Sequence, residues 1–264
     1  MWTPPGGTLG ELVESAWKRA QAIDTSGSRD LRAARVPSLS AALRGDRVKV
    51  IAEIKRSSPS KGIINAAIDA GEQASRYEAG GAAAISVLTE PIRFGGSNSD
   101  IARVREACAL PILKKDFHVC ESQIEEAAML GASAALIIVR AIEPTRLERL
   151  AAAARDAGIE LLYEVRDEAE MVRALNAGAT MIGVNNRDLE TLRIDSETVG
   201  RLVPLIPSDV VAIAESGYST REQVQIAAAA GSDAVLVGSS LSGAGDPASA
   251  VAAIADVSRG SRRN

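Results

Sequence analysis

The sequence has few of the residues that bind metals or form disulfides. Its 264 residues include one histidine and two cysteines. The histidine, His118, is followed two residues later by Cys120, a spacing that matches no recognised zinc motif. We therefore predict no metal site, and we expect His118 to lie at the surface or to support its neighbours. Cys108 and Cys120 are expected to stay reduced, because disulfides are rare in intracellular proteins.

Strong positive charge and long apolar runs are also missing. The 30 basic and 34 acidic residues give a net charge of −4, which argues against electrostatic binding of nucleic acid. The longest apolar runs, such as residues 134–139, have six residues, whereas a membrane-spanning helix needs about 20. The first residues lack the charged start and apolar core of a signal peptide. We expect a cytoplasmic protein without membrane or nucleic acid partners.

What the sequence does contain is a repeated unit, in which an alanine-rich amphipathic stretch leads to a glycine and then to a short β-branched run. The glycine suits the end of a helix, and the run suits a buried strand. The four clearest strands follow Gly81, Gly131, Gly178 and Gly231. Four more strand candidates lie at residues 48–55, 111–115, 160–165 and 210–215.

Eight strand candidates at regular spacing predict a (β/α)8 barrel. Their C-terminal ends lie 21 to 33 residues apart, which leaves room for one helix and two loops in each interval. An open dinucleotide-binding sheet would carry a Gly-x-Gly-x-x-Gly turn after its first strand, but residues 56–62 read RSSPSKG. We therefore expect an α/β fold with one domain, a single TIM barrel at residues 48–257.

Both ends of the chain extend beyond this barrel. Thr8 and Glu11 form a capping-box pattern ahead of apolar residues at helical spacing, which predicts an extra helix within residues 1–47. We expect this N-terminal helical extension to plug or brace the barrel rather than to bind substrate. Residues 258–264 contain three arginines and are expected to form a flexible basic tail.

The polar residues at the strand ends follow the alternation of a barrel strand. Residues two apart share a face, and one face of each barrel strand points inward. On five strands the inward-facing residue is apolar or glycine first and polar two residues later, near the C-terminal end of the strand. The pairs are Ile51 with Glu53 (followed by Lys55), Leu113 with Lys115, Leu162 with Glu164, Gly183 with Asn185, and Ile213 with Glu215. A single charged pair would fit a structural role, but so many converging charges favour an active site at the barrel mouth.

Small residues follow the seventh and eighth strands. They are Ser216 and Gly217 after one, and Gly238 and Ser239 after the other. Barrels commonly hold phosphate on backbone N–H groups at these two positions, so we predict a phosphate site there. The loop at residues 57–62 is either a clamp on the substrate or simply a flexible serine-rich loop.

Six strings in register closely resemble the indole-3-glycerol phosphate synthase family. They are AEIKRSSPSKG at residues 52–62, SVLTE at 86–90 with FGGS at 94–97, PILKKDF at 111–117, GVNNRDL at 183–189, AESG at 214–217 and VGSSL at 237–241. Each string is short, but all lie in the right order on the expected strands. The resemblance extends over residues 36–248.

The resemblance implies an enzyme of tryptophan biosynthesis that acts on a small sugar phosphate. Such enzymes close the indole ring of 1-(2-carboxyphenylamino)-1-deoxyribulose 5-phosphate and release carbon dioxide and water without a cofactor. A cationic acid must polarise the ribulose carbonyl, and a second group must then remove a hydroxyl and a proton. By resemblance, Lys115 is the acid and Glu164 the acid-base group. We expect a monomer; complexes with other pathway enzymes are left open.

The remaining site residues are also assigned by resemblance. Glu53 orients the catalytic lysine, and Lys55 lies beside the substrate as an acid or as a ligand of its carboxylate. Asn185 and Arg187 hold substrate oxygens and the anthranilate carboxylate, and Glu215 is a third carboxylate of the mouth. The phosphate cradle consists of Ser216, Gly217, Gly238 and Ser239, and the mouth loops contribute Ser58 and Phe94.

Two departures from the family and two other functions are left open. Ser57 stands where many members have alanine, and residues 62–69 lack a frequent arginine and acidic-aromatic run, so the geometry of this loop is not fixed by the resemblance. One alternative is a Schiff-base aldolase on the same fold, with Lys115 as its nucleophile. The other is a catalytically silent barrel that binds a sugar phosphate as a sensor.

Overall fold

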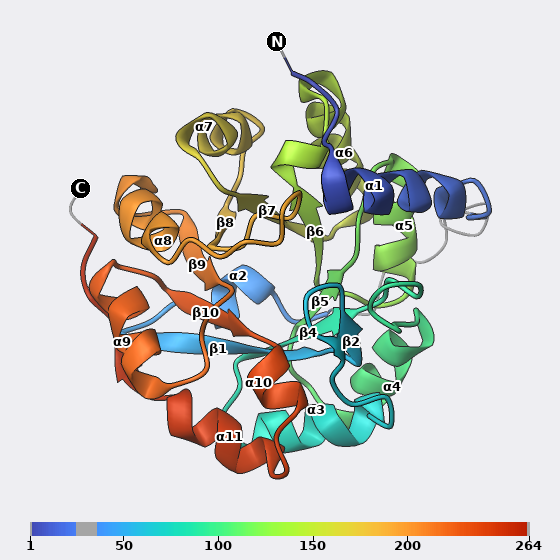
Figure 1. Ribbon diagram of the computed structural model, residues 1–264. Helices are drawn as coiled ribbons and strands as arrows, with labels where there is room; N and C mark the ends of the chain where they lie inside the picture. The colour runs from blue at the N-terminus through green and yellow to red at the C-terminus, as the bar shows by residue number, and fades with distance from the viewer. Residues whose placement is uncertain (1, 25–35, 263–264) are drawn as a thin grey trace.

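Eight strands close into one parallel barrel. The computed structural model describes residues 2–24 and 36–262. The barrel strands are β1 (Arg47–Ile54), β4 (Ala84–Leu88), β5 (Ile112–Lys115), β6 (Ala134–Ile138), β7 (Glu160–Val165), β8 (Met181–Asn185), β9 (Val211–Glu215) and β10 (Ala234–Val237). Each strand pairs with the next, and β10 pairs with β1, which closes the cylinder (Figure 1). The predicted TIM barrel and its eight strands are confirmed.

Helices follow the strands and surround the barrel (Figure 1). They are α3 (Ala70–Ala79), α4 (Ser99–Ala107), α5 (Glu121–Met129), α6 (Pro144–Ala157), α7 (Glu168–Asn176), α8 (Glu197–Leu202), α9 (Arg221–Ala229) and α11 (Pro247–Ile254), with the shorter η1 (Val139–Ala141), η2 (Val203–Leu205) and α10 (Ser239–Ser242). The glycines of the repeated unit have φ between 81° and 94°, a conformation that ends a helix without steric cost.

The floor of the barrel is apolar, as the alternation predicts. Ile51, Leu113, Leu162 and Ile213 are fully buried. Each stands two residues before a polar side chain in the last two residues of the same strand. The barrel is therefore a packed core below the mouth rather than a pore.

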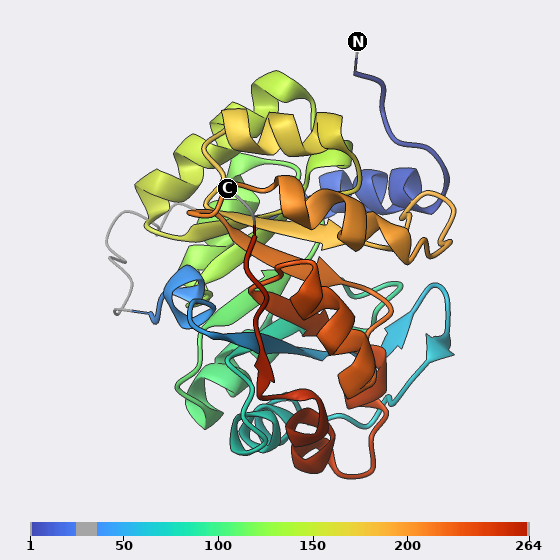
Figure 2. The same cartoon turned by 90° about the vertical axis from the view of Figure 1, so that its left-hand side faces the viewer.

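The N-terminal extension contacts both ends of the barrel. Helix α1 (Gly7–Ala20) starts at Gly7 without a side-chain cap, so the capping box predicted at Thr8 does not form. The Thr8 N–H instead donates to Glu190 O at 3.2 Å, in the loop after β8. At the opposite end, α2 (Leu39–Ala42) donates the Leu39 N–H to the carboxylate of Glu160, at the start of β7 (2.6 Å; Figure 2). Residues 25–35 of the predicted extension lie outside the described residues.

The C-terminal segment is held on the barrel and is not the flexible tail that the sequence predicts for residues 258–262. Strand β11 (Val257–Ser258) pairs antiparallel with β1. Arg259 and Arg262 both form ion pairs with Asp233, which precedes β10, and the Arg262 side chain is 3% exposed. A buried carboxylate needs such partners, and arginines at the chain end provide them. Residues 263–264 of the predicted tail lie outside the described residues.

The loop after β1 forms a small hairpin at the mouth. Strands β2 (Ser57–Ser58) and β3 (Gly62–Ile63) pair antiparallel. Figure 2 shows this hairpin on the side toward which the barrel strands point. None of the helices in the described ranges is long and apolar enough to cross a membrane.

Candidate active site

The structure brings every predicted site residue to one cavity of about 350 Å³ at the C-terminal ends of the strands. These residues are Glu53, Lys55, Ser58, Phe94, Lys115, Glu164, Asn185, Arg187, Glu215, Ser216, Gly217, Gly238 and Ser239. A cavity at this end of a barrel that combines apolar walls with convergent charged groups is the expected form of an active site.

Lys115, the last residue of β5, lies between two carboxylates. Its Nζ atom is 3.1 Å from Glu164 Oε2 and 3.4 Å from Glu215 Oε2. Burial alone would lower the pKa of Lys115, but the surrounding carboxylates, Glu164 first, raise it above its ordinary value. The lysine is therefore held as a cation with a proton to donate.

Glu215, at the end of β9, is buried and incompletely paired. Burial raises its pKa to about 8, although the charge of Lys115 opposes the rise. Its Oε1 atom has no hydrogen-bond partner among the described residues. A Cβ atom on Gly183 of β8 would overlap this oxygen, so the glycine of the predicted β8 pattern leaves the space that the carboxylate occupies.

A second lysine and carboxylate pair stands on β1. Lys55 Nζ lies 2.6 Å from Glu53 Oε1, and the Ser86 hydroxyl is 3.5 Å from Glu53 Oε2. Gly238 is the reason that this pair fits, since a Cβ atom there would overlap the Glu53 carboxylate. The pair therefore lies directly beside the predicted phosphate cradle.

Asn185 links the Glu164 carboxylate to the loop after β8. Its Nδ2 atom donates to Glu164 Oε1 at 2.9 Å, while its Oδ1 atom accepts from the Arg187 N–H at 2.8 Å. The Arg187 guanidinium donates to Leu192 O at 2.8 Å, and burial lowers its pKa. The Glu164 carboxylate is therefore held at Oε1 by the Asn185 amide and at Oε2 by Lys115.

The two predicted phosphate turns lie side by side, because β9 and β10 are paired strands. Ser216 and Gly217 have φ of 65° and 93°, so both adopt the left-handed conformation. Successive backbone N–H groups in such turns can form a concave anion site. Gly238 precedes α10, whose first residue is Ser239.

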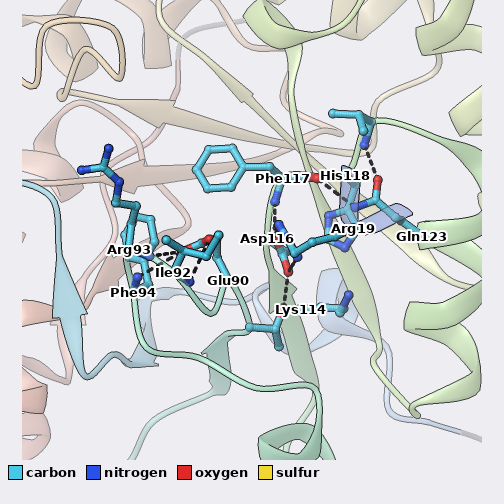
Figure 3. A network of polar contacts seen from close by, with 12 residues as sticks. Arg19, Glu90, Ile92, Arg93, Phe94, Lys114, Asp116, Phe117, His118 and Gln123 are labelled. Atoms are coloured by element: carbon cyan, nitrogen blue, oxygen red, sulfur yellow. Dashed lines mark hydrogen bonds and ion pairs between the residues drawn. The ribbon is translucent and has the colours of Figure 1, made fainter. Parts of the chain in front are cut away.

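An aromatic wall closes one side of the cavity. The rings of Phe94 and Phe117 are tilted, with centroids 6.2 Å apart, and both line the cavity. Figure 3 shows what holds them. Asp116 accepts two hydrogen bonds from Arg19 of α1, at 2.7 and 3.1 Å, and one from Phe117 N. Glu90 accepts from three backbone N–H groups of the loop that carries Phe94.

Several lining residues were not predicted from the sequence. Besides Phe117 they include Leu88, Leu136, Ile138, Leu189 and Tyr218. Leu136 and Ile138 stand two apart on β6, so the alternation rule applied to apolar residues would have found them. Of the two positions expected for His118, the surface one is wrong, because the residue is 2% exposed. Its Nδ1 atom lies 2.8 Å from Leu136 O, and burial lowers its pKa to about 3.

Comparison with known proteins extends the geometric evidence. Residues 13–254 match the family model for indole-3-glycerol phosphate synthase. The chain is 51% identical over 211 residues to indole-3-glycerol phosphate synthase 1 of Streptomyces coelicolor, covering 80% of this chain and 78% of that one. It is 47% identical over 245 residues to a synthase of Kineococcus radiotolerans, covering 93% and 86%.

A comparison of folds gives a more distant neighbour. Thiamine phosphate pyrophosphorylase from Pyrococcus furiosus superposes with a TM-score of 0.60 at 16% identity, covering 82% of this chain and 96% of that chain. This likeness concerns the barrel alone, whereas the family model and the sequence relatives span both the barrel and its mouth. The chain therefore belongs to the indole-3-glycerol phosphate synthase family.

Proposed function

We propose that the mouth residues close the indole ring of 1-(2-carboxyphenylamino)-1-deoxyribulose 5-phosphate by general acid-base catalysis. The observation that carries the proposal is the position of Lys115 Nζ between the carboxylates of Glu164 and Glu215, in the cavity that also contains the phosphate cradle. A charged acid, a base and an anion site at one mouth supply what this carboxy-lyase reaction requires.

Lys115 is the acid in the first step. It donates a proton to the ribulose carbonyl oxygen as the ring carbon that bears the carboxylate attacks the carbonyl carbon. The neighbouring carboxylates keep the lysine charged, since they raise its pKa above the ordinary value. This attack forms the new carbon–carbon bond, and the carboxylate then leaves as carbon dioxide, so that the electron pair of the broken bond restores the aromatic ring.

Glu164 serves the second half of the reaction. The hydroxyl must leave as water, and a carbon-bound proton beside it must be removed to form the double bond of the new ring. Glu164 lies beside Lys115 and is held by Asn185 at 2.9 Å, so one carboxyl group can give the first proton and accept the second. Lys55, paired with Glu53, stands at the opposite side of the mouth as a second cation for the substrate.

The rest of the mouth binds the two ends of the substrate. Backbone N–H groups at Ser216, Gly217, Gly238 and Ser239 receive the phosphate. Arg187 offers planar donors for the anthranilate carboxylate, and the wall of Phe94 and Phe117 packs against the aromatic ring. Ser58 reaches the same cavity from the β2–β3 hairpin.

A Schiff-base aldolase is less well supported by the electrostatics of Lys115. A lysine nucleophile must lose its proton before it attacks a carbonyl, and such lysines have a lowered pKa. Here the carboxylates act in the opposite direction. Borohydride added during turnover should therefore trap no adduct on this lysine, whereas an aldolase would be inactivated.

The test is product formation by the purified chain. Incubation with the carboxyphenylamino-deoxyribulose phosphate should produce indole fluorescence, and mass spectrometry should identify indole-3-glycerol phosphate together with released carbon dioxide. A folded chain that binds the substrate without forming product would contradict the proposal and favour the silent sugar-phosphate barrel.

We also propose a setting for this activity. The enzyme works as a cytoplasmic monomer without nucleic acid or membrane partners, and its helical extension (1–47) and barrel (48–257) act as one domain. Contacts of α1 with the mouth loops, such as the Arg93–Glu11 pair at 2.7 Å, support a single unit. Light scattering during size-exclusion chromatography tests the monomer, since a dimer would give a molar mass twice that of the chain.

A further inference from the structure

The proposed reaction consumes one proton from solvent in each turnover. The substrate carboxylate is ionised at neutral pH, but it leaves as neutral carbon dioxide, and the hydroxyl leaves as water. One proton is given to the carbonyl oxygen and one to the departing hydroxyl, whereas only one is recovered from carbon. This inference rests on the proposed function, because that proton balance follows from it.

The mouth is a poor route for this proton while the substrate is bound. Glu164 and Glu215 are only 3% and 2% exposed. The substrate's ring and chain occupy the cavity directly above them. A second route from solvent to Glu164 would let the site recover its proton before the product leaves the barrel mouth.

A second cavity of about 340 Å³ lies behind this carboxylate. Glu164, Ile138 and Leu189 line both cavities, so these side chains lie between the two spaces. The second cavity continues between η1, the start of α7 and the loop after β8. It is large enough for several water molecules and is lined by polar groups that bind water.

The second cavity is lined by three arginines and five acidic residues, which makes it unsuited to an anion. Its arginines are paired with carboxylates: Arg140 with Glu190 at 2.8 Å, Arg166 with Asp188 at 2.9 Å, and Arg201 with Glu168 at 3.5 Å. Paired guanidinium groups attract an anionic ligand weakly. Water and protons are therefore better candidates for its contents.

Glu170 is a buried titratable group of this cavity that forms no ion pair with any of the described residues. It lies on the first turn of α7, is 7% exposed, and accepts the Arg166 N–H at 2.8 Å through one oxygen. The groups that influence it are Arg166, Asp167 and Arg173 of its own turn and helix, Arg140 of η1 and Glu164 of β7. Burial, with the charges of Asp167 and Glu164, raises the pKa of Glu170 to about 7. It can therefore gain and lose a proton near neutral pH.

We propose that the second cavity is a proton channel to the active site, in which Glu170 relays protons from solvent to Glu164. Lys115 gives its proton to the carbonyl oxygen, and the Glu164 carboxyl group gives one to the departing hydroxyl and then removes one from carbon. This recovered proton passes from Glu164 to the neutral amine of Lys115 across 3.1 Å. Glu164 is then a carboxylate, and before the next turnover it takes a proton through water in the cavity from Glu170, whose O–H bond breaks as the new O–H bond forms. Solvent reprotonates Glu170, so one proton enters per turnover.

The test compares first and later turnovers of Glu170→Gln, which keeps the oxygen that caps α7 but cannot relay a proton. The first turnover, measured by rapid mixing, should keep the wild-type rate. The steady-state kcat should fall about tenfold, less than the loss of a direct acid, because solvent still reaches the mouth between turnovers. Imidazole buffer should restore kcat in proportion to its concentration, and Glu170→Asp should retain most of it.

The matched control is Glu168→Gln, on the same turn of α7 but exposed and outside both cavities. It should keep wild-type kcat at every buffer concentration. Two results would overturn the channel: a steady-state kcat of Glu170→Gln equal to wild type, or an equal loss in first and later turnovers that imidazole leaves unchanged. Absence of product from the wild-type chain would instead overturn the proposed function itself.

Discussion

Gly183 on β8 leaves open the space that the Glu215 carboxylate of β9 occupies. The two residues are not neighbours in sequence, and their relationship arises from the pairing of the two strands. Without a side chain at Gly183, Glu215 turns inward and reaches Lys115 at 3.4 Å. The barrel strands therefore determine the position of the charged groups at the mouth as well as packing the core.

Gly183→Ala should displace Glu215 and weaken the acid site. We expect kcat to fall and the free energy of unfolding to decrease by about 1–3 kcal/mol, as for other overpacked cores. Steady-state turnover and urea denaturation measure the two effects. Gly200→Ala in α8 is the control, because nothing lies within 4 Å of a Cβ atom there. An active Gly183→Ala variant of unchanged stability would contradict the steric argument.

Arg19→Gln should loosen the aromatic wall of Phe94 and Phe117, because Arg19 holds Asp116, the residue before Phe117. Asp116 is 2% exposed, and burial raises its pKa, but hydrogen bonds from Arg19 and the charge of Lys114 hold that pKa below its usual value. Loss of the arginine leaves a buried carboxylate short of partners, so unfolding should become easier by about 3 kcal/mol. Because Phe117 follows Asp116, KM should rise more than kcat falls. An unchanged KM would show that α1 does not position the wall.

Arg262→Ala should reduce stability without affecting catalysis. The Arg262–Asp233 pair lies at the end of the barrel opposite the mouth, with both side chains nearly buried. We expect a loss of about 1–3 kcal/mol, since Arg259 still pairs with the carboxylate. The exposed Lys18–Glu14 pair provides the comparison, and Lys18→Ala should cost less than about 1 kcal/mol. If the two variants were equally stable, the ion pair of Arg262 would not stabilise the fold, and residues 258–262 would behave as a solvated tail.

Stability should fall as pH rises through neutrality, in part because of Glu170. A carboxyl group whose pKa is higher in the folded than in the unfolded chain favours the folded state in its protonated form. Its contribution is complete below the unfolded value near 4.5 and is lost as pH rises through about 7. Glu170→Gln should therefore flatten the dependence of unfolding free energy on pH between 5 and 8. Glu168→Gln should keep the wild-type dependence of unfolding free energy on pH. The prediction is contradicted if the curves of unfolding free energy against pH are parallel for the wild type, Glu170→Gln and Glu168→Gln.

The regular spacing of eight strand candidates was sufficient to predict the fold, and strand alternation predicted the gathering of polar residues at the mouth. The rule places Glu53, Lys115, Glu164, Asn185 and Glu215 on inward faces, and all of them line one cavity. This succeeds because a barrel turns a local pattern of two residues into a shared position in space. The catalytic roles of these residues stay predictions until variants are measured.

Contacts between distant segments could not be predicted in the same way. The Arg19–Asp116 pair joins residues 97 apart, and no local pattern marks either partner. Glu170 has the sequence appearance of an ordinary helix-start residue, and only the second cavity gives it another interpretation. The sequence of the basic C-terminal segment suggests exposure to solvent because the partner of its arginines, Asp233, lies more than 25 residues earlier in the chain.

The most direct test of the central claim is the single-turnover rate of indole formation in Lys115→Ala and Glu164→Gln beside the wild type. Binding of the substrate is measured separately by fluorescence titration, and circular dichroism checks the fold. The account predicts that both variants bind substrate and lose about 10²–10⁴-fold in rate, the usual contribution of a positioned acid or base. Folded variants that form product at the wild-type rate would contradict it.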